Sequence, residues 1–172
     1  MSRIAIELWE RSLEAAYRTD PFHAVRRNLE SVRSEEWDVR PAAWNVDVFG
    51  TQPELSICDI ALHVGGPKFM YAARLAGDND LDWENIQPPP TLDMDSVLAW
   101  IDEGHRTLEA AIAALEDDAE LAAERLAPWR RPLRVEGLLS IVVNHDVYHS
   151  GEINRQRALI RGAEGWDREP AS

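Results

Sequence analysis

Two histidines in the last third of the chain have the spacing of metal ligands. His145 and His149 lie four residues apart in the segment NHDVYHSGE, which begins at residue 144. Residues four apart lie one turn from each other on the same face of an α-helix, so both imidazoles can reach one ion. Neutral imidazole nitrogen binds zinc, nickel, iron and copper. The spacing therefore predicts a transition-metal site.

The same helical face also carries an acid. A step of 100° per residue places Glu152 and a run of mostly apolar residues within about 60° of His145: Leu138, Ile141, Val142, His149, Gln156, Leu159 and Ile160. Asn144 and Asp146 are predicted to point away to either side, with Tyr148 at the flank. Two polar side chains on a core-facing stripe need partners. A shared metal ion explains them better than two core histidines satisfied by hydrogen bonds.

A third ligand is needed, because a catalytic zinc-type site has three protein ligands and one open position. The candidates are His23, His63 and His105, or a carboxylate. His63 lies about two turns into a helix with a clear start signal, where it could face the interior. His23 follows a helix start and His105 borders an apolar stripe, both of which are typical of structural histidines. The residues alone leave the third ligand open.

The elements that must position these residues are predicted to be almost all helical, since no long alternating run and no hairpin signal occurs. Amphipathic helices are expected at about 3–18, 56–75, 93–115 and 135–161, the last ending at Gly162. Asp20-Pro21 predicts the start of a second helix or a kink in one long helix. Pro67 predicts a bend. Residues 34–54 and 76–92 read as connections, with one more turn near 116–124. We expect one helical bundle domain over 1–172.

Composition excludes several classes of function. The net charge of −13 offers no basic surface for nucleic acid. No run of about 18 apolar residues is present, so no membrane span is predicted. The charged N-terminal segment lacks the apolar region of a signal peptide, and the single Cys58 suits a reducing compartment. We therefore expect a cytoplasmic protein.

Three segments resemble the DinB-like (YfiT-like) proteins. SICDIALHV at 56–64 is similar to their helix start S-h-x-[DE]-h-h-x-H-h, where h is hydrophobic. HDVYHSGEI at 145–153, with Gly137 before it, is similar to their last-helix motif H-[DE]-x-[YH]-H-x-G-Q-I. SEEWDVRP at 34–41 is similar to the connection between helices. The resemblance extends from about residue 22 to residue 162, and the order and spacing of the motifs are more specific than any one of them.

The resemblance implies an all-α four-helix bundle, here with an extra or kinked N-terminal helix. It implies a three-histidine site of His63, His145 and His149 for a divalent metal, with zinc or nickel favoured and iron as a further option. Some members of that family are thiol-dependent S-transferases or isomerases, and others are hydrolases. We expect a metal-dependent enzyme for a small molecule, with a low-molecular-weight thiol among the candidates. Glu152 replaces a common Gln and, with Tyr148, is the candidate catalytic or ligand-orienting residue.

Two alternatives differ in the class of protein. HDVYH is one methylene short of the zincin motif H-E-x-x-H, with Glu164 as the third ligand, although Asp146 is shorter than the glutamate base of such enzymes. The other alternative is a non-catalytic binding or sensing module with a structural metal or none. A homodimer is compatible with either reading.

Overall fold

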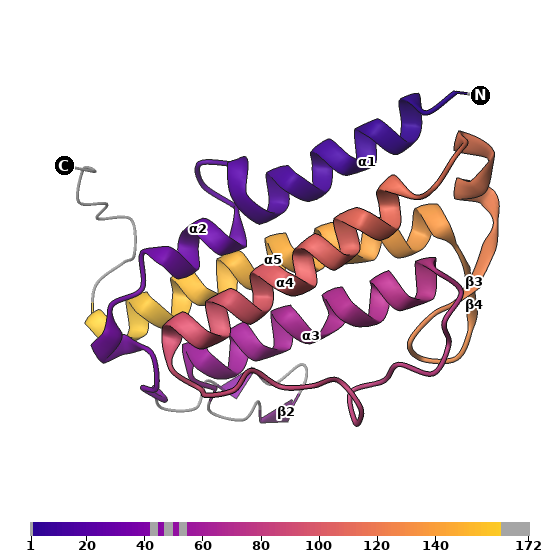
Figure 1. The fold of residues 1–172 in the computed structure, drawn as a ribbon. Coiled ribbons are helices and arrows are strands. Elements are labelled where there is room, and N and C mark those ends of the chain that lie inside the picture. The colour runs from indigo at the N-terminus through magenta and orange to yellow at the C-terminus, as the bar shows by residue number, and fades with distance from the viewer. Residues whose placement is uncertain (1, 42–44, 47–49, 52–54, 163–172) are drawn as a thin grey trace.

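The computed structural model describes residues 2–41, 45–46, 50–51 and 55–162 of the 172-residue chain. Three long helices form its body: α3 (Ile57–Leu75), α4 (Met94–Ala113) and α5 (Val135–Arg161). The helix α1 (Ile4–Glu14) packs along α4 and α5 (Figure 1). The predicted all-α bundle is confirmed. None of the helices within the described residues is long and apolar enough to cross a lipid bilayer.

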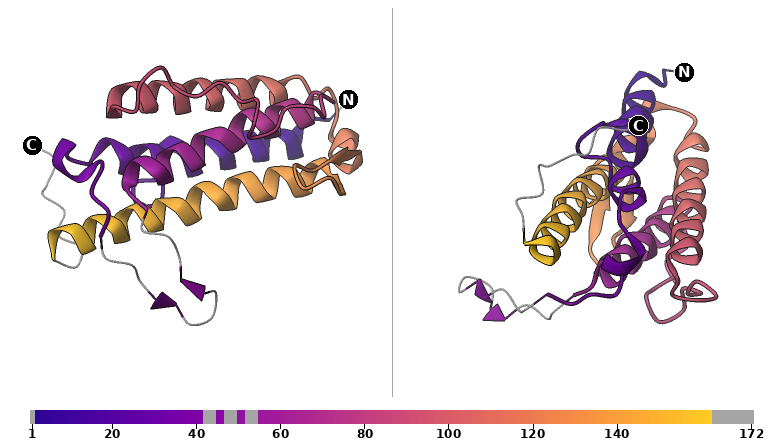
Figure 2. Two further views of the ribbon diagram at one scale, coloured as in Figure 1. Left: turned by 90° about the horizontal axis from the view of Figure 1, so that it is seen from below. Right: turned by 90° about the vertical axis from the view of Figure 1, so that its left-hand side faces the viewer.

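The connection between α3 and α4 reverses along the bundle, so the two helices run in parallel (Figure 1). Its end is tied to the start of α3, because Trp37 Nε1 and Cys58 Sγ both donate to the carbonyl of Leu92, at 2.8 and 3.7 Å. Helix α5 runs in the opposite direction and packs against α3 (Figure 2). The middle of α5 therefore faces the first half of α3.

The N-terminal region differs from its prediction. Helix α1 continues into a π-helical turn, η1 (Ala15–Thr19), and α2 (Val25–Glu30) begins only after a turn. Asp20 Oδ1 accepts from the backbone N–H groups of Phe22 and His23, at 2.8 and 2.7 Å. Asp20 thus closes a local turn instead of capping α2, as short acidic side chains often do. The predicted helix start at Asp20-Pro21 is wrong, but the extra N-terminal helix is present.

The start of α3 follows its prediction. The Ser56 hydroxyl accepts from the Asp59 N–H at 3.1 Å, and the Asp59 carboxylate accepts from the Ser56 N–H at 2.8 Å. This reciprocal pair satisfies two backbone donors that an uncapped helix would leave free. At Pro67, where the sequence predicts a bend, α3 remains one uninterrupted helix.

Short strands were not predicted. The described residues contain two antiparallel pairs: β1 (Asn45–Val46) with β2 (Gly50–Thr51), and β3 (Glu124–Leu126) with β4 (Pro132–Arg134). The turn between β3 and β4 uses Arg130 at φ 63°, a conformation that usually selects glycine or asparagine. Strands of two or three residues are too short to show an alternating pattern. The described part of the chain also has two 3₁₀ turns, η2 (Ser34–Glu36) and η3 (Asp118–Ala122), the latter within the predicted turn region.

The core consists of two apolar clusters with buried polar residues between them. One cluster includes Leu108, Ile112 and Leu138, and the other includes Ile60, Ile101 and Ile153. Each long helix passes from one cluster to the other at a fully buried polar side chain: Lys68 on α3, His105 on α4 and Asp146 on α5. Such side chains are rarely buried unless they are paired.

Candidate metal centre

Three imidazoles converge between α3 and α5. His145 Nε2 lies 3.2 Å from His63 Nε2 and 3.1 Å from His149 Nε2, and the three ligand atoms all lie within 4.8 Å of one another. An ion held tetrahedrally by bonds of 2.0–2.1 Å keeps its ligand atoms about 3.3 Å apart. The two distances from His145 Nε2 are therefore close to the separation of ligand atoms around a single bound ion. The structure brings together the three histidines that the sequence and the family resemblance named.

Burial favours the neutral, metal-binding form of His63 and His145. His149 is buried, His145 is half-buried and His63 is exposed, so the group opens to solvent on the His63 side. Burial, followed by the charge of the neighbouring His149, lowers the pKa of His63 and lowers the pKa of His145 to about 3. Neutral imidazoles present lone pairs to one another, and a cation between them satisfies those lone pairs. The residues present thus fit a divalent transition metal.

Glu152 contacts one of the three imidazoles. Its Oε2 lies 2.6 Å from His149 Nδ1, so the Nδ1–H can donate to the carboxylate while Nε2 keeps its lone pair for an ion. A carboxylate behind a ligand histidine is a common way to fix the ring and its tautomer. This contact supports the orienting role expected for Glu152. Tyr148 is 68% exposed and has its ring edge-on to His149, with 4.9 Å between ring centroids.

Asp146 was predicted to lie to one side of the core-facing stripe, and its complete burial was not predicted. It is fully buried and accepts a hydrogen bond from Lys68 Nζ at 2.6 Å, where both side chains have no exposed surface. The Lys68 ammonium also lies 4.5 Å from the centre of the Tyr17 ring. Helical periodicity gave α5 one buried face, but α3 covers the flank that carries Asp146 as well. The pair joins the two helices that supply the histidines.

Trp83 is a site residue that sequence reasoning missed. Its indole is stacked on the His63 ring, with 5.7 Å between centroids and 12° between planes. It comes from the connection between α3 and α4, which has no periodic pattern. The one signal was Gly66, three residues after His63, because a Cβ there would lie 2.2 Å from the Trp83 ring.

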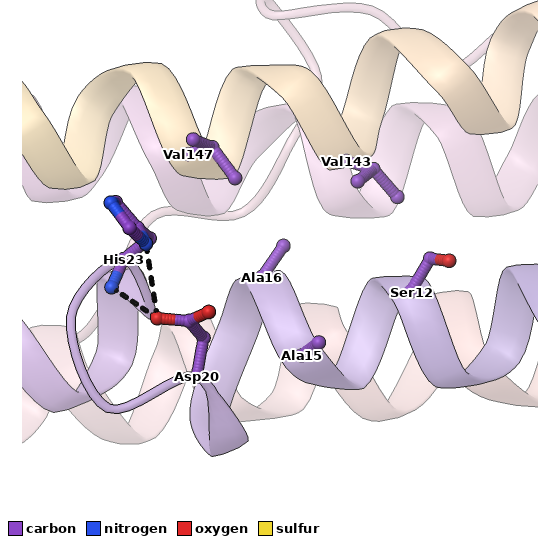
Figure 3. Close-up of a pocket in the computed structure, with 7 residues that line it drawn as sticks. All are labelled: Ser12, Ala15, Ala16, Asp20, His23, Val143 and Val147. Carbon is purple, nitrogen blue, oxygen red and sulfur yellow. Dashed lines mark hydrogen bonds and ion pairs between the residues drawn. The ribbon is translucent and has the colours of Figure 1, made fainter.

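His23 lies outside the three-histidine group. Its ring Nδ1 is 3.1 Å from Asp20 Oδ1, and its side chain borders a groove of about 380 Å³ between η1 and α5 (Figure 3). Val143 and Val147 line the α5 side of this groove. Val147 is two residues from both His145 and His149, so it lies on another face of the helix.

His105 also lies elsewhere. It is fully buried, stacks on the Tyr17 ring at 3.7 Å between centroids, and has Nε2 within 3.3 Å of Glu14 and 3.5 Å of Glu109. These contacts join α1 to α4. Glu164, the third ligand of the zincin-like alternative, lies outside the described residues.

Comparison of the chain with known proteins identifies its fold and its family. A solved structure described as the conserved protein of locus from Enterococcus faecalis is similar at a TM-score of 0.62 and 13% sequence identity, with 94% of this chain and 99% of that chain covered. At this identity the likeness concerns the fold alone. No curated protein matches the chain. A family model described as the DinB superfamily matches residues 20–153, which is most of the chain. The chain therefore belongs to the DinB superfamily.

Proposed function

We propose that the protein binds one divalent transition-metal ion through His63, His145 and His149 and uses it in an enzymatic reaction of a small molecule. The observation that carries this proposal is the convergence of three Nε2 atoms on a side of the bundle that is open at His63. Three protein ligands with one open position are typical of catalytic metal sites, whereas structural sites are closed by four. Neutral ligands also leave the ion its full charge.

The metal would act as a Lewis acid that polarises a substrate carbonyl or favours the thiolate form of a thiol substrate. Thiol-dependent group transfer and hydrolysis are the two reaction types that we propose. Three imidazoles suit zinc and nickel, with iron as a third option. Glu152 would hold His149 in the required tautomer. The Lys68–Asp146 pair would hold α3 and α5 in the relative position that brings His63 to the other two histidines.

Metal analysis of the purified protein tests the ligand set. Wild type, His63→Ala and His149→Ala should be compared with His23→Ala, a histidine outside the group. We expect about one ion per chain in the wild type and in His23→Ala, and a loss in the other two variants. Retention of the ion by His63→Ala, or no ion in the reconstituted wild type, would overturn the proposed site.

The open position needs a separate test. Cobalt(II) in place of the native ion gives a visible spectrum that reports coordination number. Azide should change that spectrum if one position is exchangeable. A spectrum insensitive to azide would indicate a closed site and would favour the non-catalytic module over the enzyme.

A further inference from the structure

Trp83 has an unusual position for a large aromatic side chain. It comes from a connection, is 51% exposed, and places its ring plane almost parallel to that of a metal-ligand candidate, His63. A tryptophan that only filled the core would bury its indole more fully. The exposed part of the indole therefore lies beside the open side of the three-histidine group.

The backbone of α3 is shaped to receive the indole. Gly66 lies one turn beyond His63, and a Cβ at Gly66 would lie 2.2 Å from Cζ3 and 2.6 Å from Cη2 of Trp83. Real Cβ atoms do not approach other atoms so closely, so any other residue at 66 would displace the ring. The glycine thus lets the six-membered ring of Trp83 rest on the helix backbone next to His63.

The residue before Trp83 anchors the connection. Asp82 Oδ1 accepts from Arg74 Nη2 at 2.9 Å, and the Arg74 side chain is fully buried. Arg130 binds the other carboxylate oxygen of Asp82. Arg74 also donates to the carbonyls of Asp78 and Leu81, at 3.3 and 3.1 Å. This network fixes the chain on the N-terminal side of Trp83, so the position of the indole is built into the fold.

A second aromatic side chain flanks the group from α5. Tyr148 lies edge-on to His149 and is 68% exposed, while Trp83 lies over His63 from the crossing connection. A molecule that approaches the exposed side of His63 therefore meets an aromatic face. Aromatic faces bind planar apolar groups by stacking and by removal of apolar surface from water.

We propose that Trp83 forms the apolar wall of the substrate site and selects small molecules in which a metal-binding anionic group is attached to a planar apolar group. The proposal rests on the metal site proposed above. It assigns Trp83 a role in substrate specificity, with Gly66 and Asp82 as the residues that position it.

The test compares two probes with the same metal-binding group. Benzohydroxamate and acetohydroxamate differ in a phenyl ring against a methyl group, and both change the visible spectrum of a cobalt(II) site when they bind. For the cobalt-loaded wild type we expect about tenfold tighter binding of benzohydroxamate. In Trp83→Ala this preference should fall below about threefold, while the affinities for cobalt and for acetohydroxamate stay within about twofold of wild type. Trp83→Phe should keep part of the preference.

Two further variants test whether the loss of preference comes from the position of the Trp83 ring or from the removal of any exposed tryptophan. Gly66→Ala keeps the tryptophan but displaces its ring, so it should lose the preference as Trp83→Ala does. Trp129→Ala removes a tryptophan that is also 51% exposed and should behave as wild type. If Trp83→Ala takes up cobalt and still prefers benzohydroxamate as strongly as the wild type does, the role of Trp83 is overturned and the metal site is not. A wild type that takes up no cobalt would overturn the metal site and the wall together.

Discussion

The buried pair between Lys68 and Asp146 allows a quantitative prediction for Lys68→Met. Both side chains are fully buried, with 2.6 Å between Nζ and Oδ2. Without the ammonium, the carboxylate would be an unpaired buried charge, and protonation of Asp146 would relieve it. Keeping an acid with an ordinary pKa of 3.8 protonated at pH 7 costs about 1.4 kcal/mol per pH unit, or about 4 kcal/mol. Burial already raises the pKa of Asp146 in the wild type, so we expect Lys68→Met to lose up to about that much free energy of unfolding.

The loss should depend on pH with a definite sign. In Lys68→Met the folded-state pKa of Asp146 lies above its unfolded value of 3.8. Below pH 3.8 the carboxyl group is protonated in both states and costs no stability. Above that value the unfolded state ionises, so the variant loses stability as pH rises. At pH 5 the deficit relative to wild type should therefore fall below about 2 kcal/mol. Urea denaturation of the metal-free proteins, followed by far-ultraviolet circular dichroism at both pH values, measures these differences.

The double variant Lys68→Met/Asp146→Asn is the matched control, because it removes the charge while keeping the shape of both side chains. It should recover most of the stability lost at pH 7 by the single variant. A double variant as unstable as Lys68→Met would assign the loss to packing against Tyr17. A loss below about 1 kcal/mol at pH 7, or one that does not change with pH, would refute the electrostatic reasoning.

Three further predictions concern the site and the core. Because burial lowers the pKa of His63 and of His145, the latter to about 3, protons compete weakly for these ligands as pH falls. Log Kd for zinc should rise by less than about two for each pH unit that the pH falls between about 6.5 and 5, and a rise near three per unit would contradict this reasoning. Glu152→Ala removes the acceptor for His149 Nδ1 and should weaken zinc binding by about tenfold or more in a chelator competition assay, whereas the exposed Glu103→Ala should not; equal effects would remove the orienting role. Leu108→Ala, at a fully buried position, should cost about 2–5 kcal/mol in urea denaturation, and Leu92→Ala, 57% exposed, should cost under about 1 kcal/mol.

Helical periodicity and capping chemistry were sufficient to predict the long helices and to place two of the three histidines of the candidate site on one helix face. The Ser56–Asp59 cap marks the start of α3, and the spacing of His145 and His149 places both on one face of α5. The third histidine required the family resemblance, because no local pattern relates His63 to His145, which lies 82 residues later in the chain.

The missed features depend on which elements cover one another. Asp146 is buried because α3 packs over its flank of α5. The periodic pattern of α5 alone does not show that a second helix covers this flank. Trp83 reaches His63 from a connection whose path is set by anchors such as Asp82. The strands β3 and β4 have three residues each, too few for a pattern.

The order of the ligands along the chain fixes when the proposed centre can form. His63 is made early, and the two histidines of α5 follow at least 82 residues later. Because a chain is synthesised from its N-terminus, a nascent chain that ends before α5 contains one of the three ligands and has no α5 to pack against α3. Ion uptake at the proposed three-histidine site would therefore follow the docking of the last helix. The ion would then bind only the finished fold and stabilise it, so metal supply would act on the lifetime of the folded protein after synthesis.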